Sequence, residues 1–115
     1  MRIAVTYDFD SGEIFQHFGQ TQNFLLVDVD GNERKEMIIT NGGNSHHSLI
    51  DYLNDLEVHV LIAGGMGNHA YELLKQAGIK VFPGQSGLAK EAVDKYLEGK
   101  MEFNPNMVHT CDCHH

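Results

Sequence analysis

The sequence contains no tryptophan, only two prolines and only two cysteines among its 115 residues. The cysteines, Cys111 and Cys113, are separated by a single residue. A disulfide between them would close a very small, strained ring, because a disulfide requires a specific placement of the two Cβ atoms. We therefore expect two free thiols, which indicate a reducing compartment or a metal that holds them.

Basic residues are also scarce, with 8 Lys and Arg against 16 Asp and Glu and a formal net charge of -8. An acidic surface repels phosphate backbones, which argues against nucleic acid and anionic membranes as partners. No apolar run approaches the roughly 18–20 residues of a membrane span, and the first residues read as a strand rather than as a leader peptide. We expect a cytoplasmic protein. The alternative interpretation of the negative charge is that it only keeps protein molecules apart.

The length and the 42% hydrophobic content predict one domain with its own core. We expect this α/β domain over residues 1–100, followed by a Cys/His-rich tail over residues 101–115. Helices are expected from near His46, over Asn68–Ala77 and up to about Glu98. Apolar strands are expected at five places: Arg2–Tyr7, Asn23–Asp30, Glu33–Thr40, Val58–Ala63 and Ile79–Phe82.

The order of these elements predicts a mixed five-stranded sheet, in the order 3-2-1-4-5 with strand 2 antiparallel, and three helices. That layout is the ribonuclease H-like three-layer fold. The winding reverses between strands 1 and 4, so a ligand is expected beyond their carboxyl ends, near the loops 8–19 and 64–68. The third strand could be an exposed edge, which leaves a monomer or a homodimer as alternatives.

The segment His17-Phe18-Gly19 in the first loop is a candidate binding segment. Histidine is the commonest metal-ligating side chain, and Gly19 would let a bulky ligand approach the backbone. Phe18 and Phe24 could pack the loop against the domain. The alternative is that His17 is an exposed histidine without a partner.

The segment Gly64-Gly65-Met66-Gly67 opens the second helix and is another candidate. Glycines leave backbone N–H groups accessible at a positive helix end, which suits a phosphate or a negatively charged cluster. The spacing matches neither GxGxxG nor a P-loop. The alternative is that these glycines only make a tight turn between a strand and a helix.

The end of the chain is dense in nitrogen and sulfur donors. Thiolates and imidazoles suit zinc, copper(I) and iron–sulfur species, but the spacing is not that of a zinc ribbon. We expect Cys111, Cys113 and His114 to ligate metal, with zinc as one candidate. The alternative is a tail that binds no metal in the native protein.

Other titratable residues carry weaker hypotheses. His46 could point toward the same crevice, but a polar residue in the first turn of a helix is the simpler interpretation. His59 lies within a buried strand pattern and is expected to be structural. Asp8 and Asp10 could hold a divalent metal in a hydrolase or nuclease, although the expected fourth strand offers no acid near Ala63 to complete the site.

Taken together, these segments resemble the dinitrogenase iron–molybdenum cofactor-binding family, the NifX- and NifB-like domains. The resemblance covers about residues 1–100. It rests on Arg2-Ile3-Ala4-Val5, on His17-Phe18-Gly19 with Phe24, and on the segments 60–67 and 73–81.

The resemblance implies a ribonuclease H-like fold that binds iron–molybdenum cofactor, a precursor or a related metallocluster, with His17 as the candidate ligand. It implies a carrier that passes the cluster from a donor to an acceptor protein, and not an enzyme. We expect no accessory domain in a chain of this size, a departure from the nitrogen-fixation members that argues against a nitrogenase role and leaves cluster binding intact. The alternatives are a ligand-free interaction or regulatory module and a divalent-metal hydrolase or nuclease.

Overall fold

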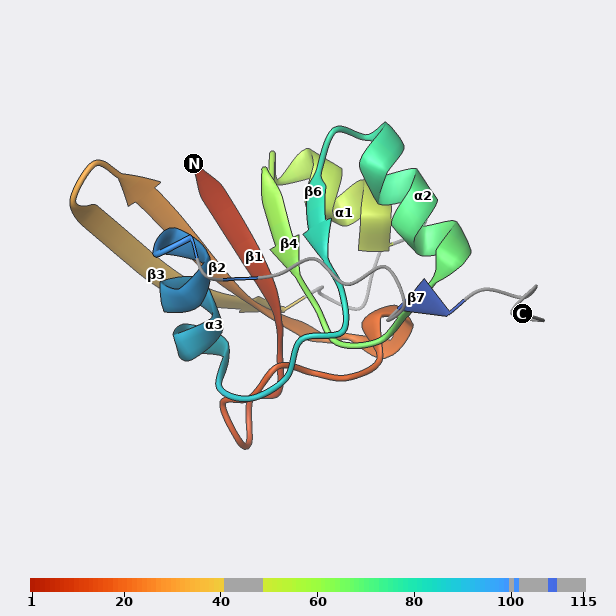
Figure 1. Cartoon of the computed structure of the whole chain (residues 1–115), viewed down its shortest axis with the longest axis horizontal. Helices are drawn as coiled ribbons and strands as arrows, with labels where there is room; N and C mark the ends of the chain where they lie inside the picture. Colours follow the sequence, from red (N-terminus) through yellow and green to blue (C-terminus); the bar gives the residue numbers. More distant parts are fainter. Residues whose placement is uncertain (41–48, 100, 102–107, 110–115) are drawn as a thin grey trace.

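The computed structural model describes residues 1–40, 49–99, 101 and 108–109. Its main sheet has five strands in the order β3-β2-β1-β4-β6 (Figure 1). β2 is antiparallel to β1 and β3, whereas β1, β4 and β6 are parallel to one another. The strands are β1 (Arg2–Tyr7), β2 (Asn23–Asp30), β3 (Glu33–Thr40), β4 (Val60–Ile62) and β6 (Lys80–Phe82).

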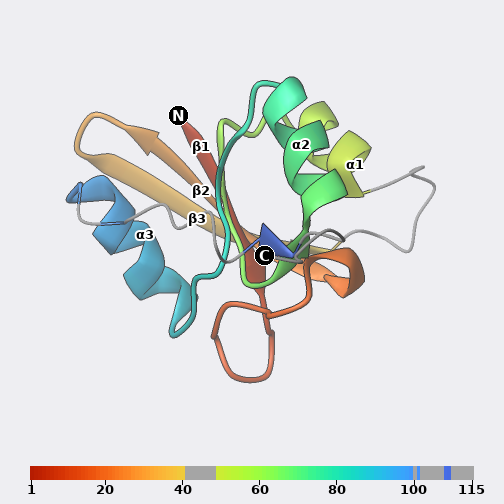
Figure 2. The same ribbon diagram turned by 45° about the vertical axis from the view of Figure 1, so that its right-hand side comes forward.

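Helices cover both faces of this sheet. α1 (Leu49–Asp55) and α2 (Asn68–Gln76) lie on one face, and α3 (Ala89–Leu97) lies on the other (Figure 2). The mixed five-stranded sheet with three helices confirms the predicted α/β class, whereas the ribonuclease H-like designation stays a prediction. The expected start of the first helix near His46 lies outside the described residues. No helix in the described part of the chain is long and apolar enough to cross a membrane.

The core is divided between the two faces by the alternation of β1. Ala4 packs with residues of α1 and α2, including Leu53 and Leu74. Its neighbours Ile3 and Val5 point to the opposite face and pack in the cluster that includes residues of α3. Since successive side chains of a strand point to opposite faces, a continuous apolar strand such as β1 is buried on both sides.

Three short elements were not predicted from the sequence. η1 (Phe18–Gln20) is a 3₁₀ turn in the first loop. β5 (Met66–Gly67) forms a separate parallel pair with β7 (Val108–His109). β7 lies within the range that the sequence assigns to the tail, so part of that range runs along the segment that precedes α2.

Candidate functional site

Two binding segments that the sequence predicts separately are joined at the carboxyl ends of β1 and β4. His17 and Gly65 form an isolated parallel bridge. The Phe18 N–H donates to the Gly65 carbonyl at 3.0 Å, and the Gly65 N–H donates to the Gln16 carbonyl at 2.8 Å. These hydrogen bonds hold the loop that follows β1 against the loop that follows β4.

Gly64 explains how the two loops come so close. A Cβ atom at this position would lie 2.6 Å from the Gln16 Cα and 2.8 Å from the Phe15 carbonyl oxygen. The Gly64 carbonyl also accepts a hydrogen bond of 2.9 Å from the Gly84 N–H. Gly64 therefore has a packing role, because only a residue without a side chain fits between these two segments.

The first loop buries Phe18 and leaves His17 exposed. Phe18 is 4% exposed and belongs to the same core cluster as Phe24, as the sequence suggests. The His17 carbonyl accepts hydrogen bonds from the Gln20 N–H at 3.0 Å and from the Thr21 hydroxyl at 3.2 Å. The backbone that carries His17 is therefore fixed while its imidazole remains accessible.

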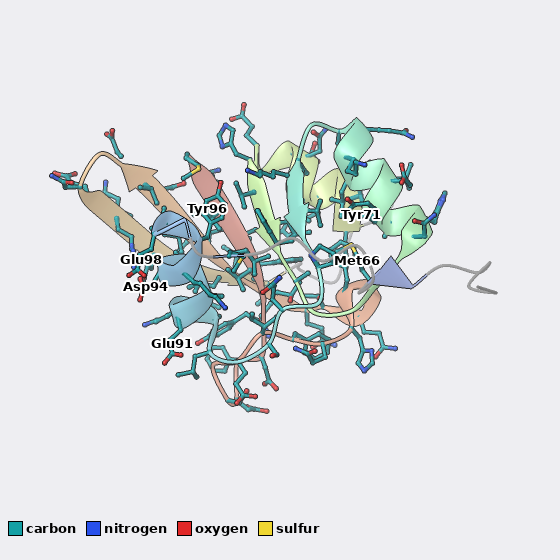
Figure 3. The ribbon with its side chains drawn as sticks, viewed as in Figure 1. Met66, Tyr71, Glu91, Asp94, Tyr96 and Glu98 are labelled. Carbon is teal, nitrogen blue, oxygen red and sulfur yellow. The ribbon has the colours of Figure 1, made fainter. Side chains whose placement is uncertain are left out.

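A cavity of about 670 Å³ opens between these loops. All predicted contact residues except Gly64 line it. Met66, labelled in Figure 3, is only 3% exposed and packs in the core, so little of its side chain reaches the cavity. The described lining residues are Gln16, His17, Phe18, Gly19, Gln20, Gly65, Met66, Gly67, Gly84 and Ser86.

The electrostatics of this cavity suit an anion. None of its described lining residues is an Asp, Glu, Lys or Arg, although the whole chain has a net charge of -8. Gly67 is the N-cap of α2 and offers no side-chain cap, so the partial positive charge of the helix end borders the cavity. The Gly65 N–H, in contrast, is engaged by Gln16 and does not serve a ligand as the sequence suggests.

The described donor set does not hold a bare metal ion. Within the part of the chain that the structure describes, no group of three His, Cys, Asp or Glu side chains could do so. His17 is the one nitrogen or sulfur ligand of that set that lines the cavity. Cys111, Cys113 and His114 lie outside the described residues.

β7 brings the end of the described chain to the rim of the cavity. It pairs with β5 so that His109 stands beside Gly67, which lines the cavity. Cys111 follows His109 by two residues in the sequence.

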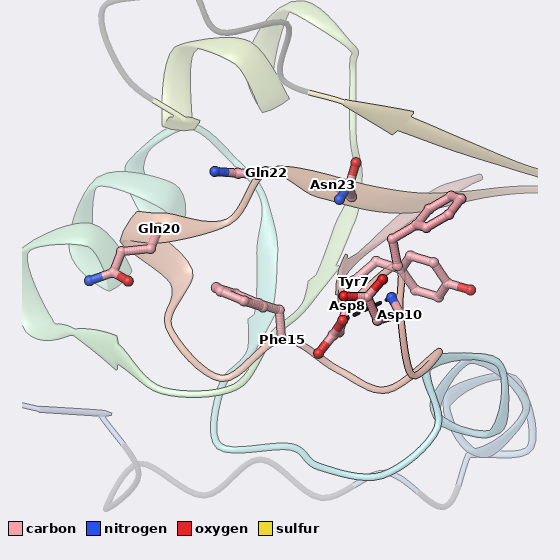
Figure 4. Close-up of a pocket in the computed structure, with 8 residues that line it drawn as sticks. Tyr7, Asp8, Asp10, Phe15, Gln20, Gln22 and Asn23 are labelled. Carbon is pink, nitrogen blue, oxygen red and sulfur yellow. Dashed lines mark hydrogen bonds between the residues drawn. The ribbon is translucent and has the colours of Figure 1, made fainter.

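Asp8 and Asp10 lie in a different cavity, of about 590 Å³ (Figure 4). The Asp10 N–H donates to the Asp8 carboxylate at 3.0 Å, which is a local turn of the kind that Asp residues form with their own backbone. The rest of the described lining is amide and aromatic side chains with no third carboxylate. The two aspartates thus shape their loop. The described residues of this cavity provide no third carboxylate to complete the metal site of a hydrolase.

The remaining histidines of the described chain fall outside the cavity lining. The prediction that His59 lies in a buried strand is wrong, because β4 begins at Val60 and His59 is exposed. Its Nδ1 accepts a hydrogen bond of 3.0 Å from the Arg2 N–H. His69 is exposed on α2. Sequence reasoning missed Gln16, Gln20, Gly84 and Ser86 in the cavity, and for the last two there was no usable signal, because the loop after β6 reads only as a turn.

Known proteins resemble this chain over most of its length. The model of the family described as dinitrogenase iron-molybdenum cofactor matches residues 1–99. The chain belongs to this family. An uncharacterized protein of Methanocaldococcus jannaschii is 29% identical over 108 residues, which cover 89% of this chain and 90% of that relative.

Two solved structures extend the similarity of this family member to three dimensions. The apo form of the orange protein from Desulfovibrio gigas has a TM-score of 0.74 and 28% identity, over 90% of this chain and 92% of that chain. A Thermotoga protein proposed to be a NifB protein has a TM-score of 0.66 and 27% identity, over 89% and 91% of the two chains. The family fold is therefore shared over nearly the whole length of each.

Proposed function

We propose that this chain binds an iron–molybdenum-type or other iron–sulfur cluster as cargo and delivers it from a donor protein to an acceptor protein. The observation that carries the proposal is the joining of His17-Phe18-Gly19 to Gly65-Met66-Gly67 around one cavity, in a chain of this family. The chain acts as a carrier and not as an enzyme. It works in the cytoplasm, where the cysteine thiols stay reduced.

His17 ligates an iron of the cluster in this proposal. Its imidazole is exposed at the cavity, and neutral imidazole is a common metal ligand near neutral pH. Buried Phe18 holds the loop, and no heavy atom lies within 4 Å of the place that a Gly19 Cβ would occupy. The loop therefore combines a fixed donor with open space for a bulky ligand.

The charge of the cluster is balanced by the protein backbone. Metal–sulfur clusters held by thiolates or sulfides carry net negative charge, which the N-terminus of α2 at Gly67 favours. The absence of carboxylates among the described lining residues removes the repulsion that the acidic chain would otherwise exert. Within residues 64–67, Gly64 contributes to the site by packing and the Gly65 N–H is held by Gln16. The backbone N–H groups of Met66 and Gly67 balance the charge of the cluster in this proposal.

Cys111, Cys113 and His114 supply further ligands or cover the cluster. β7 supports this role, because it belongs to the tail and pairs with β5 at the rim of the cavity. Residues 1–100 then hold the cluster-binding surface and residues 101–115 the soft donors. Zinc at these tail residues is the alternative occupant, and it would leave the protein colourless.

The relatives support a removable ligand. The orange protein, with which this chain shares 28% identity, was solved in an apo form, a description that implies a ligand-bound form of that protein. The family description names the iron-molybdenum cofactor. A carrier needs such reversibility, because its cargo must leave intact.

The proposal is tested by titrating anaerobically purified, untagged protein with iron–sulfur or iron–molybdenum cluster and recording metal content and absorption. We expect stoichiometric iron with charge-transfer bands. His17→Ala should weaken binding by at least about tenfold, since even residues behind a ligand often contribute that much. His69→Ala is the matched control, because it removes an exposed histidine that does not line the cavity.

Equal affinity of the His17→Ala and His69→Ala proteins would exclude His17 as a ligand. A wild-type protein that takes up no cluster would exclude the carrier function and favour the ligand-free interaction module.

A further inference from the structure

The outer edge of β3 is long and carries apolar side chains at its centre. β3 spans eight residues at one end of the sheet (Figure 1). Met37 is 59% exposed and Ile38 is 43% exposed. Among the described residues no strand pairs with this edge. Such an edge is a template for pairing with another strand.

The hydrogen bonds of β2 fix which backbone groups of β3 are directed outward. Val29 exchanges both backbone hydrogen bonds with Met1, at 3.0 and 2.8 Å, so its polar groups face β1. Backbone groups alternate along a strand, so those of Asp28 face β3. Lys35 is opposite Asp28 and therefore faces back toward β2.

The same alternation directs the N–H and C=O groups of Arg34, Glu36 and Ile38 away from β2. The next residue in this series, Thr40, agrees with the assignment, because its carbonyl accepts a hydrogen bond of 2.7 Å from the Tyr52 hydroxyl rather than from β2. β3 thus directs the backbone donors and acceptors of Arg34, Glu36 and Ile38 to its outer edge, whereas the Thr40 carbonyl is already held by Tyr52.

The opposite edge of the sheet is protected in a way that β3 is not. β6 has only three residues. Lys80 lies 5.5 Å from the Phe82 ring centroid, and Lys75 of α2 lies 5.0 Å from that of Tyr71. Short edge strands and lysines are common means of preventing edge pairing. The contrast makes β3 the edge of the described sheet that is suited to a partner strand.

The charge of β3 favours a second copy of this chain as that partner. Its charged residues, Glu33, Arg34, Lys35 and Glu36, sum to zero, whereas the chain as a whole has a net charge of -8. Pairing along this strand would therefore bring no net charge of one copy against the other. On the α3 side, Arg34 lies 2.7 Å from Asp94 and Glu36 lies 3.6 Å from Lys90, so these charges are matched within each copy.

We propose that two copies of the chain pair antiparallel through the outer edges of β3, centred on Met37. In an antiparallel pair of two β3 strands, the residue at the centre lies opposite the same residue of the other copy. The outward backbone groups allow residue 35, 36, 37 or 38 to be that central residue. Centres at Lys35 or Glu36 would place like charges directly opposite, which is destabilising. Because the Thr40 carbonyl is held by Tyr52, a centre at Met37 forms two hydrogen-bonded pairs of Glu36 with Ile38, whereas a centre at Ile38 forms only the pair of Ile38 with itself.

The pairing buries Met37 against its own copy and joins the two sheets into one. No residue of β3 lines the cavity around His17, so the cavity stays open in the dimer. The proposal therefore does not depend on cluster binding, and it is tested on cluster-free protein.

The first experiment measures the mass of the full chain by sedimentation equilibrium over a range of concentrations. We expect twice the mass of one chain. Met37→Lys should raise the dimer dissociation constant at least about tenfold, since it places two lysines directly opposite each other. Phe9→Lys is the control, because Phe9 is 67% exposed on a loop away from β3, and its dissociation constant should match that of the unchanged protein.

The second experiment tests the register by oxidative cross-linking of Met37→Cys and Ile38→Cys, each combined with Cys111→Ser and Cys113→Ser. Met37→Cys should form a covalent dimer, because the two residues oppose each other in a closely spaced pair. Ile38→Cys should not, because it opposes Glu36. Cross-linking of Ile38→Cys alone would overturn the register, and the mass of a single chain at every concentration would overturn the interface.

Discussion

Gly64 shows how much of the site depends on a position without a side chain. The loops around His17 and Gly65 meet because Gly64 lets the backbone at Phe15 and Gln16 pass at a distance too short for any Cβ atom. The sequence showed a glycine-rich turn here but could not show what crosses it. The function of this glycine is therefore visible only in three dimensions.

Gly64→Ala should lower the free energy of unfolding by about 1–3 kcal/mol, the usual cost of forcing an extra carbon into a packed region. The neighbouring atoms belong to the backbone, so they cannot move aside as a flexible side chain would. Denaturant unfolding measures the change. Gly19→Ala is the matched control, because its added methyl group meets no atom within 4 Å. Equal stabilities of the two variants would show that the crossing is not tight.

At the scale of elements, the first three strands could be predicted to the residue. Apolar residues in β1 and β2 and the turn signal Asp30-Gly31-Asn32 are local, and the structure has these strands at Arg2–Tyr7, Asn23–Asp30 and Glu33–Thr40. A local pattern is sufficient where neighbours in sequence pair with each other.

The shorter elements could not be predicted for the opposite reason. β5 and β7 have two residues each, and their hydrogen bonds join segments about forty residues apart. Two residues show no periodicity. The part played by the loop after β6 in the cavity could not be predicted either, because its residues show no pattern beyond that of a turn. His17 and the glycine segment could be predicted, because their residue types carry recognisable chemistry.

Removing residues 108–115 tests the role of β7 as an element. The truncated chain should melt at a lower temperature, because β5 loses its paired strand beside α2, and it should bind cluster more weakly. The matched variant Cys111→Ser/Cys113→Ser keeps β7 and removes only the thiols, so it should keep the melting temperature and lose affinity. Unchanged melting and affinity in the truncated chain would contradict both roles.

At the scale of the whole molecule, the ion pairs of the described chain lie away from the cavity. Arg34 joins β3 to α3, and Arg2 joins three elements at the opposite end of β1 from the site. The cavity itself has no charged lining residue among those described. The acidic chain thus concentrates its matched charges where they support the sheet and leaves the site free for an anion.

The Arg2 network makes acid stability a property of the whole fold. The Arg2 Nε donates to the Asp28 Oδ1 at 2.8 Å, and its Nη1 donates to the Leu56 carbonyl at 2.6 Å, so β1, β2 and the end of α1 are tied together. The hydrogen bond from Arg2 lowers the pKa of Asp28 in the folded chain. Because the folded pKa lies below the unfolded value of about 3.9, the stabilisation is present above that pH.

This stabilisation should be lost as the pH falls through the lowered folded pKa of Asp28. Asp28→Asn should therefore melt below the unchanged protein at pH 7 and converge with it in acid. The side chain is 49% exposed, so solvent screening limits the difference to about 1 kcal/mol or less. Melting temperatures across the pH range measure it, and Glu72→Gln, an exposed carboxylate with no ion pair in the described chain, is the control. A gap between Asp28→Asn and the unchanged protein that persists below pH 2 would mean that packing, and not charge, joins Asp28 to the sheet.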